Sequence, residues 1–219
     1  MNIIIDTGCA NLSSLKFAIE RLGFKVEISA DKSLINSADK VFLPGVGTAS
    51  HAMKNLVERE LDVTIKALTQ PVLGICLGMQ LLTEQSQEGP LLGDHANQVI
   101  DCLGIIPTRI ESLNANVDQP LRVPHMGWNS SSSFSDHPIF KNIALNDYFY
   151  YVHSYGAPIS EFTIARCQYN SYADPQTSGE GIEFSAAIAK DNFCGVQFHP
   201  ERSGRLGSQL IKNFLETNP

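Results

Sequence analysis

The fold of this chain is decided by the stretch Val72-Leu73-Gly74-Ile75-Cys76-Leu77-Gly78. Apolar residues up to Ile75 predict a buried strand, and a helical pattern begins after Cys76. A cysteine between two glycines at a strand-to-helix junction has the form of a nucleophile elbow, whose tight turn leaves no room for neighbouring Cβ atoms. We therefore predict that Cys76 is a nucleophile at the carboxyl edge of a sheet, beside a helix N-terminus that favours the thiolate.

The N-terminal half of the chain alternates short apolar strands with amphipathic helices. Strands are predicted over Asn2–Asp6, Lys25–Ser29, Lys40–Leu43 and Val72–Ile75. Helical spacing of apolar residues follows the first strand from Leu12 to Leu22, continues over residues 48–68 with an interruption near Asp62, and returns at Leu77, Leu81 and Leu82. Such short connections imply right-handed crossovers and a parallel sheet covered on both faces.

The C-terminal half contains strand-like runs without long helices between them, and these predict antiparallel additions to the sheet. The runs cover Ile105–Ile110, Asp147–His153, Phe162–Tyr169, Ile182–Ala189 and Phe193–His199. Ser130–Ser133 is interpreted as a turn, Asn170–Gly181 as an exposed hairpin loop, and Leu206–Leu215 as a closing amphipathic helix. The predicted fold is a doubly wound α/β domain over residues 1–219, with a mostly parallel sheet.

Composition excludes several classes of protein. The chain has 219 residues and a formal net charge of −7, which argues against a nucleic-acid partner. No apolar run approaches the roughly 20 residues of a membrane span, and the N-terminus lacks the features of a signal peptide. The 5 cysteines form no CxxC pair, and the histidines show no metal-ligand spacing. We expect a cytoplasmic protein with reduced thiols, no metal and no cofactor.

A nucleophilic thiolate requires a general base and a group that orients the base. His199 follows the apolar run Val196-Gln197-Phe198 and precedes Pro200-Glu201. A carboxylate two residues after the imidazole can accept its N–H and fix the tautomer. Cys76, His199 and Glu201 are therefore the predicted catalytic triad.

The oxyanion formed on an attacked amide requires preorganised N–H donors. The N–H of Leu77, directly after the nucleophile, is one candidate. The second candidate is Gly47 in the run Pro44-Gly45-Val46-Gly47, which follows the third predicted strand and would lie beside the elbow. Its glycines permit the peptide rotation that would turn an N–H inward.

Three of these segments, Pro44–Gly47, Gly74–Gln80 and Gln197–Glu201, resemble the class I (triad) glutamine amidotransferases in sequence and in order. Three further segments resemble the family of glutaminase subunits of imidazole glycerol phosphate synthase. They are Asp6–Leu12, Val123–Asn129 with its Pro-His-Met-Gly-Trp-Asn run, and Tyr151–Tyr155. The resemblance covers nearly the whole chain.

The resemblance implies a flavodoxin-like core and a glutaminase. Cys76 would attack the glutamine carboxamide, His199 would protonate the leaving ammonia, and water would hydrolyse the thioester. The partner would be a (β/α)8-barrel cyclase that uses the ammonia to make imidazole glycerol phosphate and aminoimidazole carboxamide ribotide in histidine biosynthesis. The implied glutamine-binding residues are Gln80, Ser154 and Tyr155, and the implied partner-docking residues are Met126, Trp128, Tyr150 and Arg202.

The chain departs from the usual pattern of this family at Thr7, Ala10, Arg202 and Gly204. Arg202 replaces a lysine, which keeps the charge and changes the hydrogen-bond geometry. Residue types alone do not decide whether Trp128 belongs to the core or to a docking surface. Three alternatives also stay open: a glutaminase that serves another synthase, a catalytically silent regulatory subunit, and a stand-alone cysteine hydrolase.

Overall fold

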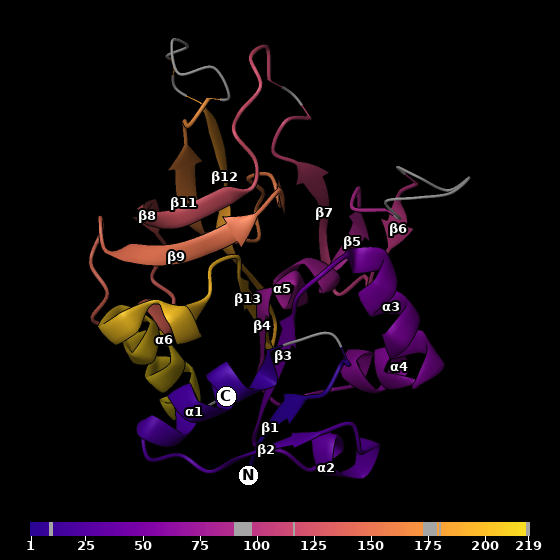
Figure 1. Ribbon diagram of the computed structural model, residues 1–219. Coiled ribbons are helices and arrows are strands. Elements are labelled where there is room, and N and C mark those ends of the chain that lie inside the picture. The colour runs from indigo at the N-terminus through magenta and orange to yellow at the C-terminus, as the bar shows by residue number, and fades with distance from the viewer. Residues whose placement is uncertain (9–10, 90–97, 116, 173–178, 180, 218–219) are drawn as a thin grey trace.

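The computed structural model describes residues 1–8, 11–89, 98–115, 117–172, 179 and 181–217 (Figure 1). Cys9, Ala10 and most of the predicted loop over 170–181 lie outside the described residues. Among the described helices, none has the length and apolar character that crossing a bilayer requires.

A nine-stranded sheet forms the centre of the molecule, in the order β2-β1-β3-β4-β13-β12-β11-β8-β9. The parallel strands are β1 Asn2–Ile5, β2 Val26–Ser29, β3 Lys40–Gly45, β4 Val72–Cys76 and β13 Phe193–Val196. The antiparallel extension consists of β12 Ile182–Lys190, β11 Thr163–Tyr169, β8 His125–Phe134 and β9 Tyr148–His153. The predicted doubly wound sheet with antiparallel additions is therefore confirmed.

Helices cover both faces of the parallel strands (Figure 1). One face packs against α1 and α6, through the core cluster that includes Leu15, Ile19 and Leu210. The other face packs against α2, α3 and α4, through the cluster that includes Leu56 and Ile65. The described helices are α1 Leu12–Arg21, α2 Lys32–Asn36, α3 Ala49–Glu58, α4 Leu61–Lys66, α5 Leu77–Leu81, α6 Gly204–Glu216 and the 3₁₀ turns η1 Pro138–Phe140 and η2 Pro200–Arg202.

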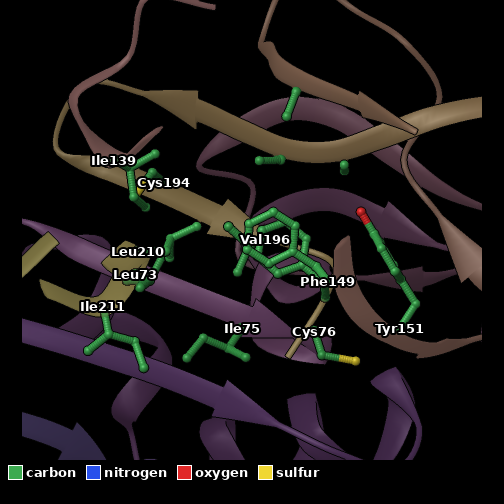
Figure 2. Packing of buried hydrophobic residues seen from close by; sticks show 14 of the residues in the cluster. Leu73, Ile75, Cys76, Ile139, Phe149, Tyr151, Cys194, Val196, Leu210 and Ile211 are labelled. Atoms are coloured by element: carbon green, nitrogen blue, oxygen red, sulfur yellow. The ribbon is translucent and has the colours of Figure 1, made fainter. Parts of the chain in front are cut away.

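The first of these core clusters ends at the predicted nucleophile. Figure 2 shows Leu73 and Ile75 of β4 among side chains of α6, with Cys76 at the margin of the cluster. Because strand residues alternate between faces, β4 contributes to both core clusters and is buried along its whole length. The burial fixes the position of β4, and with it the position of the turn that follows.

A second, four-stranded sheet in the order β10-β7-β5-β6 lies beside the main sheet. Its strands are β5 Thr83–Ser86, β6 Ile100–Asp101, β7 Ile106–Ser112 and β10 Tyr155–Gly156. The run from Ile105 to Ile110 is therefore a strand, but its predicted place in the main sheet is wrong: β7 pairs parallel with β5 and antiparallel with β10. The predicted helix after Cys76 is also shorter than its leucine spacing suggests, because the chain turns into β5 at Thr83.

Two predicted boundaries also differ from the structure. Ser130–Ser133 is not a turn but lies inside β8, because pairing with β9 and β11 outweighs the low strand preference of serine. The strand predicted to run to His199 ends at Val196. Beyond it the N–H of Gln197 still donates to the carbonyl of Ala186 in β12, but the N–H of His199 donates to the carbonyl of Tyr150 in β9 at 2.8 Å.

Candidate active site

Cys76 lies in the turn between β4 and α5, as the sequence predicts. Its backbone angles, φ 54° and ψ −113°, fall where a side chain is rarely found. A Cβ on Gly78 would lie 1.7 Å from the carbonyl oxygen of Leu43, and a Cβ on Gly74 would lie 2.8 Å from that of Gly78. The two glycines therefore let the strained turn pack directly against the neighbouring backbone.

The Cys76 side chain is 8% exposed and has polar neighbours on two sides. The Nε2 group of Gln197 donates to Sγ at 3.8 Å, and the carbonyl oxygen of Val152 lies 3.9 Å from Sγ. The α5 helix has only 5 residues, so its dipole favours the thiolate less than a longer helix would. His199 lines the same cavity as Cys76 and interacts with it electrostatically.

His199 and Glu201 form the predicted base and orienting group. The His199 Nδ1 atom lies 2.8 Å from Glu201 Oε1, and the 3₁₀ turn η2, begun by Pro200, holds the carboxylate in place. Burial alone lowers the pKa of His199, but its hydrogen bond to Glu201 and its interactions with Cys76 raise the pKa to about 10. At neutral pH the imidazole is therefore protonated, and its positive charge can stabilise a thiolate at Cys76, the reactive form of a cysteine nucleophile.

A cavity of about 250 Å³ opens over the Cys76 sulfur. It is lined by the predicted nucleophile and base, both candidate oxyanion residues (Leu77 and Gly47) and all three implied glutamine-binding residues (Gln80, Ser154 and Tyr155). Gly47 has a φ of +94°, a positive value that glycine adopts without steric strain because it has no Cβ. The structure thus brings together residues from β4, α5, β9, β10 and the segments after β3 and β13.

Gln80 is 3% exposed and its amide is held by the protein. Its Nε2 donates to the carbonyl of Tyr155 at 2.9 Å and to Oε1 of Gln197 at 3.0 Å. Gln197, fully buried, then donates to the Cys76 sulfur. Gln80 therefore fixes the Tyr155 wall of the cavity relative to the nucleophile. Gln197 is not among the predicted site residues, although a glutamine within the apolar run Val196–Phe198 is itself a signal.

Glu88 also lines the cavity and is likewise not among the predicted site residues. It accepts the N–H of Ala49, the first residue of α3, at 3.3 Å. Burial raises the pKa of Glu88 to about 7, although the hydrogen bond from Ala49 works in the opposite direction. Glu88 follows β5 in no recognisable motif, and only the folded chain places its carboxylate near Cys76.

The implied docking residues lie on the surface near this cavity. Trp128 and Met126 of β8 are 56% and 63% exposed, which places both outside the core. The Trp128 and Tyr150 rings meet edge to face, with centroids 6.1 Å apart. The Arg202 guanidinium lies over the Tyr150 ring at 4.7 Å and also lines the cavity. The surface formed by these four residues, called the β8–β9 surface below, therefore adjoins the active site.

The remaining described cysteines are unsuited to catalysis. Cys102, Cys167 and Cys194 are buried, and burial raises the pKa of each thiol to about 12. Within the described part of the chain, no three His, Cys, Asp or Glu side chains group as metal ligands would. An α/β sheet with an elbow cysteine, a buried imidazole and a carboxylate defines a triad-type cysteine amidase.

Comparisons with known proteins agree with this class. The model of the family described as "Glutamine amidotransferase class-I" matches residues 3–218. The imidazole glycerol phosphate synthase subunit HisH of Colwellia psychrerythraea is 56% identical over 221 residues, covering 98% of this chain and 92% of that protein. The subunit of the same name from Shewanella loihica is 54% identical, covering 99% of this chain and 90% of that protein.

Among solved structures, the glutaminase domain of Trypanosoma brucei CTPS has a TM-score of 0.60 at 15% identity, covering 100% of this chain and 95% of that one. This likeness shows the shared fold. The chain therefore belongs to the class I glutamine amidotransferase family, and within it to the HisH subunits of imidazole glycerol phosphate synthase.

Proposed function

We propose that this chain hydrolyses the side-chain amide of L-glutamine at Cys76 and supplies the ammonia to a cyclase subunit. The observation that carries the proposal is the buried Cys76–His199–Glu201 arrangement at the floor of a cavity of amino-acid size. At about 250 Å³ the cavity lies below the roughly 300–1,000 Å³ of sites for drug-sized ligands. Free glutamine suits this space better than a peptide does.

The reaction takes two steps at one sulfur. The thiolate attacks the carboxamide carbon, and the N–H groups of Leu77 and Gly47 stabilise the oxyanion. His199 gives its Nε2 proton to the leaving nitrogen, so the C–N bond breaks, ammonia departs and a γ-glutamyl thioester remains. His199 then takes a proton from water, the hydroxide attacks the thioester, and glutamate leaves as the thiolate returns.

The walls of the cavity place the amino-acid end of glutamine. Ser154 and Tyr155 line the part of the cavity where the α-carboxylate and α-amino groups would lie, and Gln80 holds that segment in position. Glu88 supplies the negative charge that an α-ammonium requires. Because burial raises the pKa of Glu88 to about 7, binding of the ammonium favours its ionised form.

The proposed partner is the (β/α)8-barrel cyclase of imidazole glycerol phosphate synthase. The β8–β9 surface offers exposed aromatic, thioether and guanidinium groups, a composition enriched at protein interfaces. Its position beside the cavity favours direct transfer of ammonia into the barrel, where imidazole glycerol phosphate and aminoimidazole carboxamide ribotide form in histidine biosynthesis. We place this heterodimer in the cytoplasm, where reduced thiols persist.

Ammonia release from glutamine, measured with and without the cyclase and its ribotide substrate, tests this function. We expect slow basal release that rises at least about tenfold in the complete system, a typical allosteric coupling. Equal turnover with and without the cyclase would contradict the coupling and favour a stand-alone hydrolase. A lack of turnover in the complete system would favour a silent subunit, and stimulation only by another synthase would reassign the partner.

A further inference from the structure

Two buried histidines lie next to the active site and take no part in the chemistry above. His125 of β8 and His153 of β9 face each other across the antiparallel pair, and they are 3% and 6% exposed. The His125 Nδ1 atom lies 3.0 Å from the His153 Nε2 atom. His153 also lines the glutamine cavity, one residue before the Ser154–Tyr155 wall.

The partners of each ring nitrogen determine the proton positions. The His153 Nδ1 atom lies 2.8 Å from the carbonyl oxygen of Tyr155, which only accepts, so Nδ1 carries the proton. Burial lowers the pKa of His153 to about 3 and that of His125 to about 4, so both rings are neutral at pH 7. In neutral His153 the Nε2 atom is therefore an acceptor, and the Nδ1–H of His125 donates to it.

The same reasoning extends to the outer end of the pair. With its proton on Nδ1, neutral His125 accepts at Nε2, and the Nδ2 group of Asn129 donates to that atom at 3.3 Å. All four ring nitrogens have a hydrogen-bond partner. In each hydrogen bond of the series, the donor lies farther from the cavity than the acceptor. We call this series of hydrogen bonds, from Asn129 through His125 and His153 to the Tyr155 carbonyl, the imidazole relay.

Aromatic rings pack against both imidazoles of the relay. The His125 ring stacks on Tyr151 at a centroid distance of 4.8 Å with 18° between planes, and it lies 4.2 Å from the Tyr169 ring. Phe184 meets His153 edge to face at 5.0 Å. In the low dielectric of these buried surroundings, a hydrogen bond is electrostatically stronger than in water. Leaving a buried ring nitrogen without a partner would cost free energy of folding. The relay can therefore transmit a displacement of β8 to the backbone of the cavity wall.

The two ends of the relay lie at functionally different places. At the outer end, β8 carries Met126 and Trp128 on the β8–β9 surface. At the inner end, the Tyr155 carbonyl also accepts from Gln80, whose amide leads through Gln197 to the Cys76 sulfur. Consecutive hydrogen bonds thus connect β8, where a partner would dock, with the sulfur of the predicted nucleophile.

We propose that His125 and His153 are positioning residues, which fix the Ser154–Tyr155 wall of the glutamine cavity and make it responsive to a partner docked on β8. This proposal rests on the function proposed above. Neither histidine touches the reacting atoms, and both act through the Tyr155 carbonyl. The predicted signature at pH 7 is that both rings carry the proton on Nδ1, whereas free histidine prefers Nε2.

The test compares His125→Phe, which removes the donor to His153, with His125→Asn, whose amide nitrogen occupies the place of Nδ1. In the complete system at saturating cyclase, we expect His125→Phe to raise the KM for glutamine or reduce stimulation by about tenfold or more. We expect His125→Asn to keep a KM for glutamine and a stimulation by the cyclase close to those of the wild type. Trp128→Ala is the matched control, because we expect it to weaken docking only, so that raising the cyclase to saturation restores its activity but not that of His125→Phe.

Three measurements distinguish the outcomes. Melting temperatures of both variants show whether the chain folds, and ¹⁵N chemical shifts of the wild-type imidazoles give the tautomers independently of any variant. A His125→Phe variant that folds and keeps wild-type KM and stimulation would overturn the relay, as would an Nε2–H tautomer on either ring. Absent ammonia release from wild-type protein would overturn the proposed function instead.

Discussion

Cys76→Ala is expected to abolish glutamine-dependent product formation by the complete system while leaving formation from added ammonium salts unchanged. Without the sulfur no thioester forms, and removal of a triad nucleophile costs on the order of 10⁶-fold in rate. The side chain is small and lies at the margin of its core cluster, so its loss should not unfold the chain. Product formation with each nitrogen source, measured side by side, checks this result.

The matched control for this variant is Cys194→Ala, since that cysteine is also buried but has a pKa near 12. It should keep glutamine-dependent activity. Residual glutamine turnover in Cys76→Ala would show that another group carries the reaction. Loss of the ammonium-dependent activity as well would show that Cys76 supports assembly with the cyclase rather than chemistry.

Gly78→Ala is expected to have the largest effect on stability of any single methyl addition near the site. Its Cβ would lie 1.7 Å from the oxygen and 2.8 Å from the carbon of the Leu43 carbonyl, and neither is a flexible side chain. The turn would have to separate from β3, at a cost of about 3 kcal/mol or more in the free energy of unfolding. For a chain of this size that corresponds to a fall in melting temperature of about 6–12 °C.

Gly156→Ala is the control for this prediction, because the nearest atom to its added Cβ is 3.5 Å away, an ordinary contact. Its melting temperature should stay within about 3 °C of wild type. Thermal unfolding followed by circular dichroism compares the two. A Gly78→Ala variant as stable as Gly156→Ala would mean that the elbow is looser than its backbone contacts indicate.

The features predicted correctly from the sequence are the ones that short segments encode. The elbow glycines lie within two residues of Cys76, and Glu201 lies two residues after His199, so spacing alone predicts both the turn and the carboxylate–imidazole contact. Strands β3 and β4 are likewise apolar runs, whose pattern predicts a buried strand and which are buried along their whole length in the structure.

The features that were missed depend on contacts between distant segments. Glu88 reaches the cavity only because α3 and the end of β5 meet there, and Gln197 is an ordinary strand residue until Gln80 approaches it. The serines of β8 are held in a strand by two neighbouring strands, against their local preference. The exposure of Trp128 likewise follows from the face of β8 on which it lies, which its sequence neighbours do not specify.

The most direct test of the central claim is the rate at which iodoacetamide alkylates Cys76 between pH 7.5 and 9, measured by peptide mass spectrometry. Because the pKa of His199 is raised to about 10, its positive charge persists beside the Cys76 sulfur across this range, which also lies above the pKa of about 7 for Glu88. We predict a nearly constant rate in wild type and a rate that rises with pH in His199→Asn. An increase of about eightfold in wild type, as for an ordinary thiol with a pKa near 8.5, would contradict a thiolate paired with His199.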